Sequence, residues 1–261
     1  MGTSPYIVTR GIVLRETPVR DTDKILTLLT EDRGKAAVIA KGVRKKNCKY
    51  AASAQPLAYS EWTLYQRGEW YYANEGSTIE LFDGLRESLE AMALGSYFAE
   101  LSEAAAEEEL PAGPLLRHLL NGLYALSTLH KPPELVKPVF ELKYLSLAGY
   151  EPLLTGCALC GRPDPAEPCL DIAQGTLRCR VCGTGSVSGA GFLMPLCRDS
   201  LAAARRAVYG DERRLYAFRL GGEALERLSQ VAEAFLLAQL DRRFRTLDYY
   251  HSLFPAGTGN G

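Results

Sequence analysis

The first eighty residues show a strand-like pattern of apolar and polar positions. Short runs rich in Val, Ile, Thr and aromatic residues are separated by glycine turns such as EDRGK (Glu31–Lys35) and QRGEW (Gln66–Trp70). Five strands are predicted, over Tyr6–Glu16, Thr22–Thr30, Gly34–Gly42, Gln55–Gln66 and Glu69–Ser77. Five short strands with one long connection between the third and the fourth favour a small barrel of the OB type, with an SH3-like barrel as the alternative.

From Asp83 onward, apolar residues recur every three or four positions, as in helices with one buried face. Three stripes consist of Leu85, Leu89 and Met92, then Leu116, Leu119, Leu120 and Leu123, then Val136, Phe140, Tyr144 and Leu147. The third helix should end at Gly149, and two more are predicted over Met194–Val208 and Glu223–Arg243. The predicted fold is therefore α+β in two parts. An OB-type barrel occupies residues 1–80, an all-α domain occupies 81–254, and 255–261 form a disordered tail.

Composition supports a folded chain with an uneven charge. The chain has 261 residues, of which 47% are hydrophobic, and this is ample for a buried core. Its net charge is only -1, yet residues 1–80 hold 12 basic and 9 acidic side chains, whereas residues 81–150 hold 5 and 10. A basic end suits a polyanionic partner. No apolar run approaches the roughly 20 residues of a membrane span, and no secretory signal is recognisable, so a soluble cytoplasmic protein without membrane partners is expected.

Four of the seven cysteines form two CxxC pairs, Cys157 with Cys160 and Cys179 with Cys182. A two-residue spacer lets both thiolates face one ion, and two such pairs at this distance are typical of a structural zinc ribbon or knuckle. We expect one Zn²⁺ per chain, in an element over about residues 151–192. Four thiolates leave no open position for catalysis. Cys169, between the pairs, is an alternative ligand, but it lacks the knuckle pattern.

Motifs for catalysis are missing from the sequence. It contains no GxxxxGK[ST], HExxH or GxSxG motif. The three histidines, His118, His130 and His251, are scattered, and the carboxylates of Glu107–Glu109 are adjacent residues that point in different directions on a helix. We therefore expect no enzyme and no small-molecule substrate; a nuclease would need clustered carboxylates or an open metal position.

A cationic stretch, VRKKNCKYAAS (Val43–Ser53), follows the third predicted strand, and no acidic residue occurs between Gly34 and Ser60. On an OB barrel, such a stretch can hold phosphates while bases stack on aromatic rings. The candidate cations are Lys35, Lys41, Arg44, Lys45, Lys46 and Lys49, with Tyr50 or Tyr59 as stacking platforms. Composition alone supports equally a loop that is merely solvated.

Several motifs in the same order resemble one family. RETPVRDTDKILTLLTEDRGKAAVIAKGVRKKN (Arg15–Asn47) resembles the first half of the bacterial recombination mediator family RecO, including DTDKI, the DRGK turn and KGVRK. FELKYLSLAGYEPLLTGCALCG (Phe140–Gly161) resembles the helix that leads into the zinc knuckle of that family. The resemblance extends to about Leu247, and it implies an OB barrel followed by a zinc-bearing helical domain.

The resemblance also implies a function. RecO proteins bind single- and double-stranded DNA, anneal complementary strands, partner with RecR, and help RecA replace single-stranded-DNA-binding protein (SSB). The resemblance thus implies a cytoplasmic protein that associates with the nucleoid. Carried over by position, the DNA contacts are Lys35, Lys41, Arg44, Lys45 and Lys46. The acidic SSB tail is expected on the arginine set Arg205, Arg206, Arg213 and Arg214. A zinc-ribbon scaffold that binds only proteins is the alternative.

Overall fold

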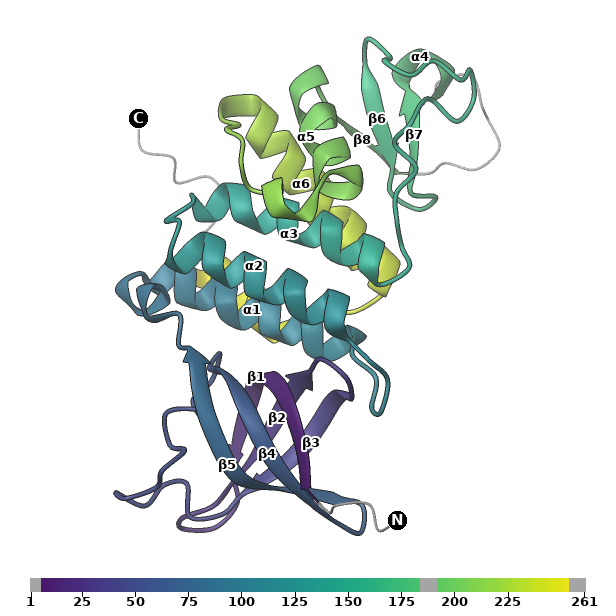
Figure 1. Ribbon diagram of the computed structural model, residues 1–261. Coiled ribbons are helices and arrows are strands. Elements are labelled where there is room, and N and C mark those ends of the chain that lie inside the picture. Colours follow the sequence, from purple (N-terminus) through teal and green to yellow (C-terminus); the bar gives the residue numbers. More distant parts are fainter. Residues whose placement is uncertain (1–5, 184–191, 254–261) are drawn as a thin grey trace. The chain divides into compact units, whose positions relative to one another are not determined.

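The computed structural model describes residues 6–183 and 192–253, which form two compact units (Figure 1). The first unit contains the chain up to Thr128 together with the residues from Phe244 onward, and the second contains Leu129–Arg243. The helices that follow the barrel directly in sequence thus belong to the same compact unit as the barrel, although the predicted boundary lay near residue 80. The predicted tail, 255–261, lies outside the described residues.

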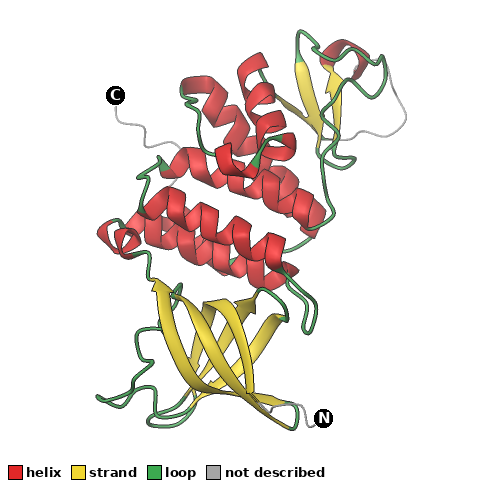
Figure 2. Cartoon of the chain, viewed as in Figure 1, coloured by secondary structure: helices red, strands yellow, loops and turns green. Residues whose placement is uncertain are grey.

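The first five strands close into a barrel, shown in yellow in the lower part of Figure 2. They are β1 (Tyr6–Pro18), β2 (Lys24–Thr30), β3 (Gly34–Ala40), β4 (Tyr59–Arg67) and β5 (Trp70–Glu80). Around the barrel the order is β1-β2-β3-β5-β4; β3 and β5 run parallel, and the other neighbours run antiparallel. This order of strands is that of the OB fold, so the predicted barrel is confirmed.

Alternation along the strands fills the barrel. The buried members include Val13, Leu26, Leu28, Val38, Trp62 and Leu64, and each is fully shielded from solvent. Their neighbours in sequence point outward, because successive side chains of a strand face opposite sides of the sheet. Tyr71 faces the core while Tyr72 is half-buried on the outer face. Part of the outer face is buried as well, since Ile12 and Leu29 are also shielded from solvent, and the part that carries Tyr72 remains accessible for functional side chains.

Helices complete the first unit. They are η1 (Asp83–Glu87), α1 (Leu89–Ala105), α2 (Gly113–Ser127) and α7 (Arg245–Leu253). Ser88 caps α1 by accepting a hydrogen bond from the Ala91 N–H at 3.2 Å. The carboxylate of Glu100 on α1 accepts hydrogen bonds from the backbone N–H groups of Arg245 and Thr246, so it satisfies the first donors of α7. These contacts place the last helix against α1.

The second unit combines helices with a small sheet. The helices are α3 (Pro133–Leu147), α4 (Arg180–Gly183), α5 (Arg198–Tyr209), η2 (Glu212–Arg214) and α6 (Gly222–Leu240), and the strands are β6 (Pro168–Asp171), β7 (Thr176–Cys179) and β8 (Leu193–Pro195), in the order β7-β6-β8. Among the described residues, no helix combines the length and the apolar character that a membrane crossing requires.

The predicted start of the helix over Met194–Val208 was wrong. Met194 and Pro195 belong to β8, and α5 begins at Arg198. A reciprocal cap sets this boundary: the Ser200 N–H donates to Cys197 Sγ, and the Cys197 N–H donates to Ser200 Oγ at 2.7 Å. The helix predicted over Glu223–Arg243 also ends earlier than expected, because Asp241 adopts a left-handed conformation with φ 45°.

A buried charge cluster joins α3 to α6. Lys137 Nζ lies 2.7 Å from Glu141 on its own helix and 2.6 Å from Glu233 on α6. Burial opposes the charge of Lys137, but attraction to the two carboxylates outweighs it, and the pKa of Lys137 is raised. This cation is consequently held between the two helices.

Candidate nucleic-acid interface and metal centre

The connection between β3 and β4 is fixed to the barrel where it begins. Gly42, in a left-handed conformation with φ 63°, turns the chain out of β3, and its N–H donates to Asp23 Oδ1 at 2.7 Å. The Arg44 N–H donates to the carbonyl of Thr22 at 3.0 Å. The Gly42 N–H is the largest cause of the lowered pKa of Asp23, and Thr22 adds a side-chain hydrogen bond. The DTDKI motif thus docks the start of the cationic loop.

The same connection is fixed again a few residues later. The Tyr50 hydroxyl donates to the carbonyl of Lys41 at 2.7 Å, and its ring packs in a T-shaped arrangement with the ring of the core residue Trp62, at 6.3 Å between centroids. Burial raises the pKa of Tyr50 to about 12. Val43 and Ala54 are buried in the barrel core. Tyr50 is therefore an anchor of the loop, although the sequence suggested it as a stacking platform.

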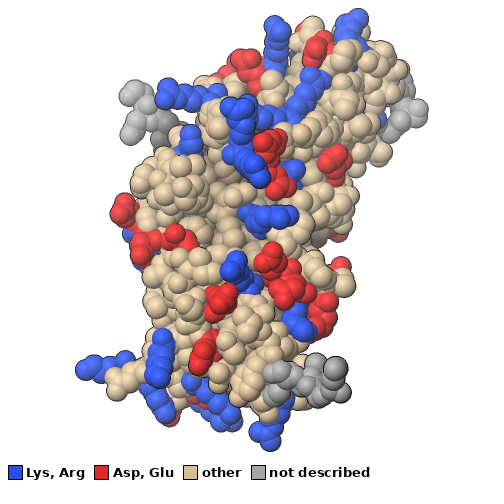
Figure 3. All heavy atoms as spheres, in the orientation of Figure 1, with Lys and Arg blue, Asp and Glu red and all other residues tan. Residues whose placement is uncertain are grey.

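Five cations lie exposed on this anchored segment: Lys41, Arg44, Lys45, Lys46 and Lys49. Within residues 6–183 and 192–253, none of them forms a salt bridge, whereas Arg10, Arg15, Lys24 and Arg33 of the same barrel each pair with a carboxylate. On the face drawn in Figure 3, Lys and Arg side chains gather over the loops at one end of the barrel, with few acidic side chains among them. We call these five residues the loop cations.

Lys35 is separated from the loop cations. It lies at the start of β3, and Lys41 follows the end of that strand, which places the two about 20 Å apart at roughly 3.3 Å per residue. The backbone N–H of Lys35 donates to the carbonyl of Glu107, in the acidic segment that follows α1. The structure brings together five of the six predicted cations, and the sixth lies at the opposite end of its strand.

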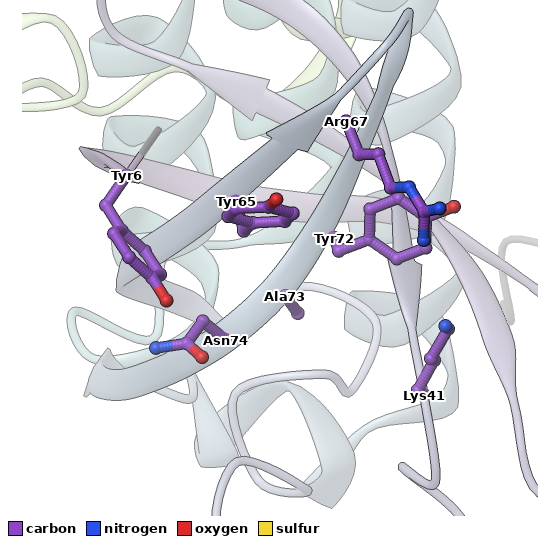
Figure 4. Close-up of a pocket in the computed structure, with 7 residues that line it drawn as sticks. All are labelled: Tyr6, Lys41, Tyr65, Arg67, Tyr72, Ala73 and Asn74. Carbon is purple, nitrogen blue, oxygen red and sulfur yellow. The ribbon is translucent and has the colours of Figure 1, made fainter. Parts of the chain in front are cut away.

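A groove on the outer face of the barrel adjoins Lys41. A cavity of about 280 Å³ is lined by Tyr6, Lys41, Tyr65, Arg67, Tyr72, Ala73 and Asn74 (Figure 4). A second cavity, of about 180 Å³, shares Lys41 and Tyr72 and extends to Arg20. Lys41 Nζ lies over the ring of Tyr72, 4.9 Å from its centroid. The groove thus combines aromatic rings with cations.

The tyrosines of the groove form a row across three strands. Tyr6 on β1 is opposite Tyr65 on β4, and Tyr65 is opposite Tyr72 on β5. The centroids of the Tyr6 and Tyr65 rings are 5.5 Å apart. Tyr59, the other predicted platform, does not line this cavity. Sequence reasoning missed the row, although outward-facing tyrosines next to buried Leu64 and Tyr71 were a visible signal.

The two CxxC pairs meet in one cluster, as their spacing predicted. The four sulfur atoms of Cys157, Cys160, Cys179 and Cys182 all lie within 4.8 Å of one another. Cys179 Sγ is 3.8 Å from Cys157 Sγ and 3.9 Å from Cys160 Sγ. Four sulfurs around zinc at about 2.3 Å would be about 3.8 Å apart, whereas a disulfide needs about 2.05 Å. The donor set and its spacing therefore fit a tetrahedral metal ion.

Local structure prepares the cluster for a metal. Gly161, with φ 73°, turns the chain after the first pair, and its N–H donates to the carbonyl of Cys157. Burial acts to raise the pKa of Cys157, but N–H groups of Cys160, Cys179 and Leu159 donate to its sulfur and lower the pKa to about 6. A thiolate is the form that binds metal. Cys169, on β6, is not a member of the cluster.

The four arginines predicted to bind the SSB tail fall into two pairs, one with internal hydrogen bonds and one exposed to solvent. Arg205 on α5 donates to the carbonyl of Leu154 at 2.9 Å, to Asp164 at 2.6 Å and to the carbonyl of Pro163. Arg206 donates to the carbonyl of Arg214 at 3.0 Å and lies over the ring of Phe218. Both guanidinium groups thus hold the unit together. Arg213 and Arg214 are exposed.

Fold and site together define a class of protein: an OB barrel with an anchored cationic loop, joined in one chain to a helical unit that carries a four-cysteine cluster. Two family models match, the N-terminal part of recombination protein O over residues 4–82 and its C-terminal part over residues 86–248. The chain belongs to the RecO family of DNA repair proteins, as its motifs predicted.

Two curated relatives match over nearly their whole length. A protein of Symbiobacterium thermophilum is 31% identical over 258 residues, which cover 94% of this chain and 97% of the relative. A protein of Acetivibrio thermocellus is 27% identical over 248 residues, which cover 95% of this chain and 97% of the relative. Both are called DNA repair protein RecO.

Proposed function

We propose that this protein is a recombination mediator that binds single- and double-stranded DNA without reading sequence and anneals complementary strands. With RecR, it helps to load RecA on single-stranded DNA coated with SSB. The observation that carries the proposal is the anchored loop with five exposed cations that lack salt bridges in the described part of the chain. Unneutralised cations are free to replace the counterions of a phosphate backbone, whatever the bases are.

Annealing follows from the same charges. Two complementary strands repel each other through their phosphates, and a protein that neutralises phosphates on both lowers this repulsion. The proposed DNA contacts are Lys41, Arg44, Lys45, Lys46 and Lys49, with Lys35 as a contact at the far end of β3. The protein would act without breaking bonds, as a cytoplasmic, nucleoid-associated mediator.

The metal in this proposal is zinc, held by Cys157, Cys160, Cys179 and Cys182. When bound, it would supply a cross-link between the β6–β7 hairpin and the segment after α3, with no open position for substrate. Arg205 ties that segment to α5 through Leu154, and Tyr209 on α5 accepts a hydrogen bond from the Leu154 N–H at 2.9 Å. The metal and these contacts stabilise the same region.

Arg213 and Arg214 are the proposed contacts for the acidic tail of SSB, because their guanidinium groups are exposed. Arg205 and Arg206 would contribute to this site by shaping it, since Arg205 already donates to Asp164 and to backbone carbonyls and Arg206 donates to backbone carbonyls. Replacing Arg213 and Arg214 with alanine should weaken binding of an SSB tail peptide while leaving DNA binding unchanged.

Strand annealing tests the proposal directly. Complementary oligonucleotides coated with SSB are mixed with and without the protein, and duplex formation is followed by energy transfer between end labels. The protein should accelerate annealing, and the Lys41, Arg44, Lys45 and Lys46 alanine variant should not. A protein that neither binds oligonucleotides at low salt nor promotes annealing would be a scaffold for other proteins, and the proposal would be wrong. Labelled DNA incubated with Mg²⁺ should remain uncut.

A further inference from the structure

The tyrosine row has no role in neutralising phosphates, yet it lines a groove next to a loop cation. Tyr6 is 50% exposed, and Tyr65 and Tyr72 are half-buried on the outer face of the barrel. Single exposed aromatic rings are common on protein surfaces, but neighbouring rings that line a groove are typical of a site where a ligand covers their apolar faces. The groove is therefore a candidate for a flat apolar ligand that carries negative charge.

The geometry of the row fits unpaired bases. The three residues are direct cross-strand neighbours on β1, β4 and β5, so their Cα atoms follow the strand spacing of about 4.8 Å. Figure 4 shows the Tyr65 ring between Tyr6 on one side and Tyr72 on the other, with Asn74 near Tyr6 and with Arg67 and Lys41 on the side of Tyr72. Rings for stacking thus lie beside cations for the sugar–phosphate backbone.

From this arrangement we infer that the tyrosine row is a subsite for unpaired bases, which makes the barrel prefer single-stranded over double-stranded DNA. The inference rests on the proposed function, since it assigns a second role within the same DNA-binding surface. Bases in a duplex are stacked on their neighbours and cannot offer their faces, whereas bases of a single strand can. The loop cations bind both forms through phosphates, and the tyrosine row binds only one.

The two parts of the surface are adjacent. Lys41 belongs both to the loop cations and to the lining of the groove, and it contacts the ring of Tyr72. A strand whose phosphates follow the loop can therefore place the next bases over Tyr72 and then Tyr65. Arg67, at the β4–β5 turn, provides a cation on the same side of the groove.

The test uses the variant Tyr65→Ala, Tyr72→Ala with three probes of equal length: a poly-dT strand, a duplex, and a strand of abasic sites. Stacking on one aromatic ring is worth about 1–3 kcal/mol, so dT binding should weaken at least about fivefold per tyrosine. Duplex binding and the salt slope of dT binding should stay unchanged. Abasic DNA should bind wild type and variant alike, because it has phosphates but no rings.

Controls separate stacking from folding. Tyr65→Phe, Tyr72→Phe should keep the preference for single strands, because the rings remain, and Tyr124→Ala on α2 removes an exposed tyrosine outside the groove. Equal losses for dT and duplex, or no loss for dT, would overturn the inference while leaving the proposed function intact. If the proposed function itself were wrong, the result would be distinguishable, because wild-type protein would then bind neither the dT strand nor the duplex.

Discussion

Replacing loop cations with alanine should flatten the salt dependence of DNA binding by an amount that the structure allows us to estimate. Each cation that neutralises a phosphate of a single strand adds about 0.7 to the slope of log K against log salt concentration. Five loop cations without salt bridges in the described residues would contribute about 3.5 to this slope. The variant in which Lys41, Arg44, Lys45 and Lys46 are alanine should lose about 2.8 of it.

The difference in slope between the wild type and the loop variant gives a large difference in the salt dependence of affinity, which an ordinary binding assay detects. When the salt concentration rises fourfold, the contribution of the five loop cations to single-strand affinity falls by about 130-fold. In the alanine variant, which keeps only Lys49 of the five, this contribution falls by about threefold. Fluorescence anisotropy of a labelled poly-dT strand, titrated at several KCl concentrations, measures both slopes. The replaced side chains are exposed, so thermal unfolding should change little.

The barrel offers a matched control with the same change in net charge. Arg10, Arg15, Lys24 and Arg33 also lie in the barrel, but each forms a salt bridge, with Glu61, Glu103, Glu16 and Glu109 respectively. Their alanine variant should keep most of the slope. Equal flattening by both variants would mean that net charge rather than the loop determines binding, and an unchanged slope in the loop variant would remove the loop from the interface.

Three further predictions concern the anchors of the loop, the metal and the buried charge cluster. Asp23→Ala should speed tryptic cleavage within residues 41–49 at neutral pH, because the Gly42 N–H loses its acceptor; folding lowers the pKa of Asp23, so in wild type the protection of the Gly42 amide against hydrogen exchange should be complete above about pH 4 and should weaken as the pH falls through the lowered pKa. Cys160→Ser should lower zinc content and increase hydrogen exchange over residues 152–183 with duplex binding retained, whereas Cys169→Ser should keep one zinc per chain; equal zinc loss in both variants would make Cys169 a ligand. Lys137→Met should destabilise the protein by about 3–5 kcal/mol in urea unfolding, because Glu141 and Glu233 lose their shared cation, and adding Glu141→Gln and Glu233→Gln should restore most of this loss.

Local patterns were sufficient to predict the barrel and the metal cluster. Burial alternates with period two in β3 and β4, and runs of Val, Ile, Leu and Thr mark β1 and β2. The turns EDRGK and QRGEW contain Gly34 and Gly68, which adopt φ values of 60° and 62°. The CxxC pairs bring two thiolates together through short local turns, so only the meeting of the pairs depended on the fold. The start of α5 was missed because its cap uses Cys197, whose sulfur is an unusual acceptor.

Features that depend on contacts distant in sequence were not predictable in the same way. The pairing of Tyr65 with Tyr72 follows from the β4–β5 hairpin, but the pairing of Tyr6 with Tyr65 requires closure of the barrel. Arg205 looked like a partner contact because nothing in its neighbourhood in sequence shows that it reaches Leu154. The sheet of β6, β7 and β8 has strands of only three or four residues, too short for alternation to be recognised.

The anchoring of the loop connects DNA binding to the stability of the barrel. Five like charges over nine residues repel one another, and an unanchored loop would spread them apart. Asp23 and Tyr50 hold the segment by hydrogen bonds, and Val43 and Ala54 hold it by burial in the core. The repulsion is thus retained in the free protein and relieved when phosphates bind, and little conformational entropy is lost on binding because the loop is already ordered. DNA should therefore stabilise the barrel against unfolding more than it stabilises the unit of α3, α5 and α6, because a ligand stabilises only the structure that must be folded to bind it.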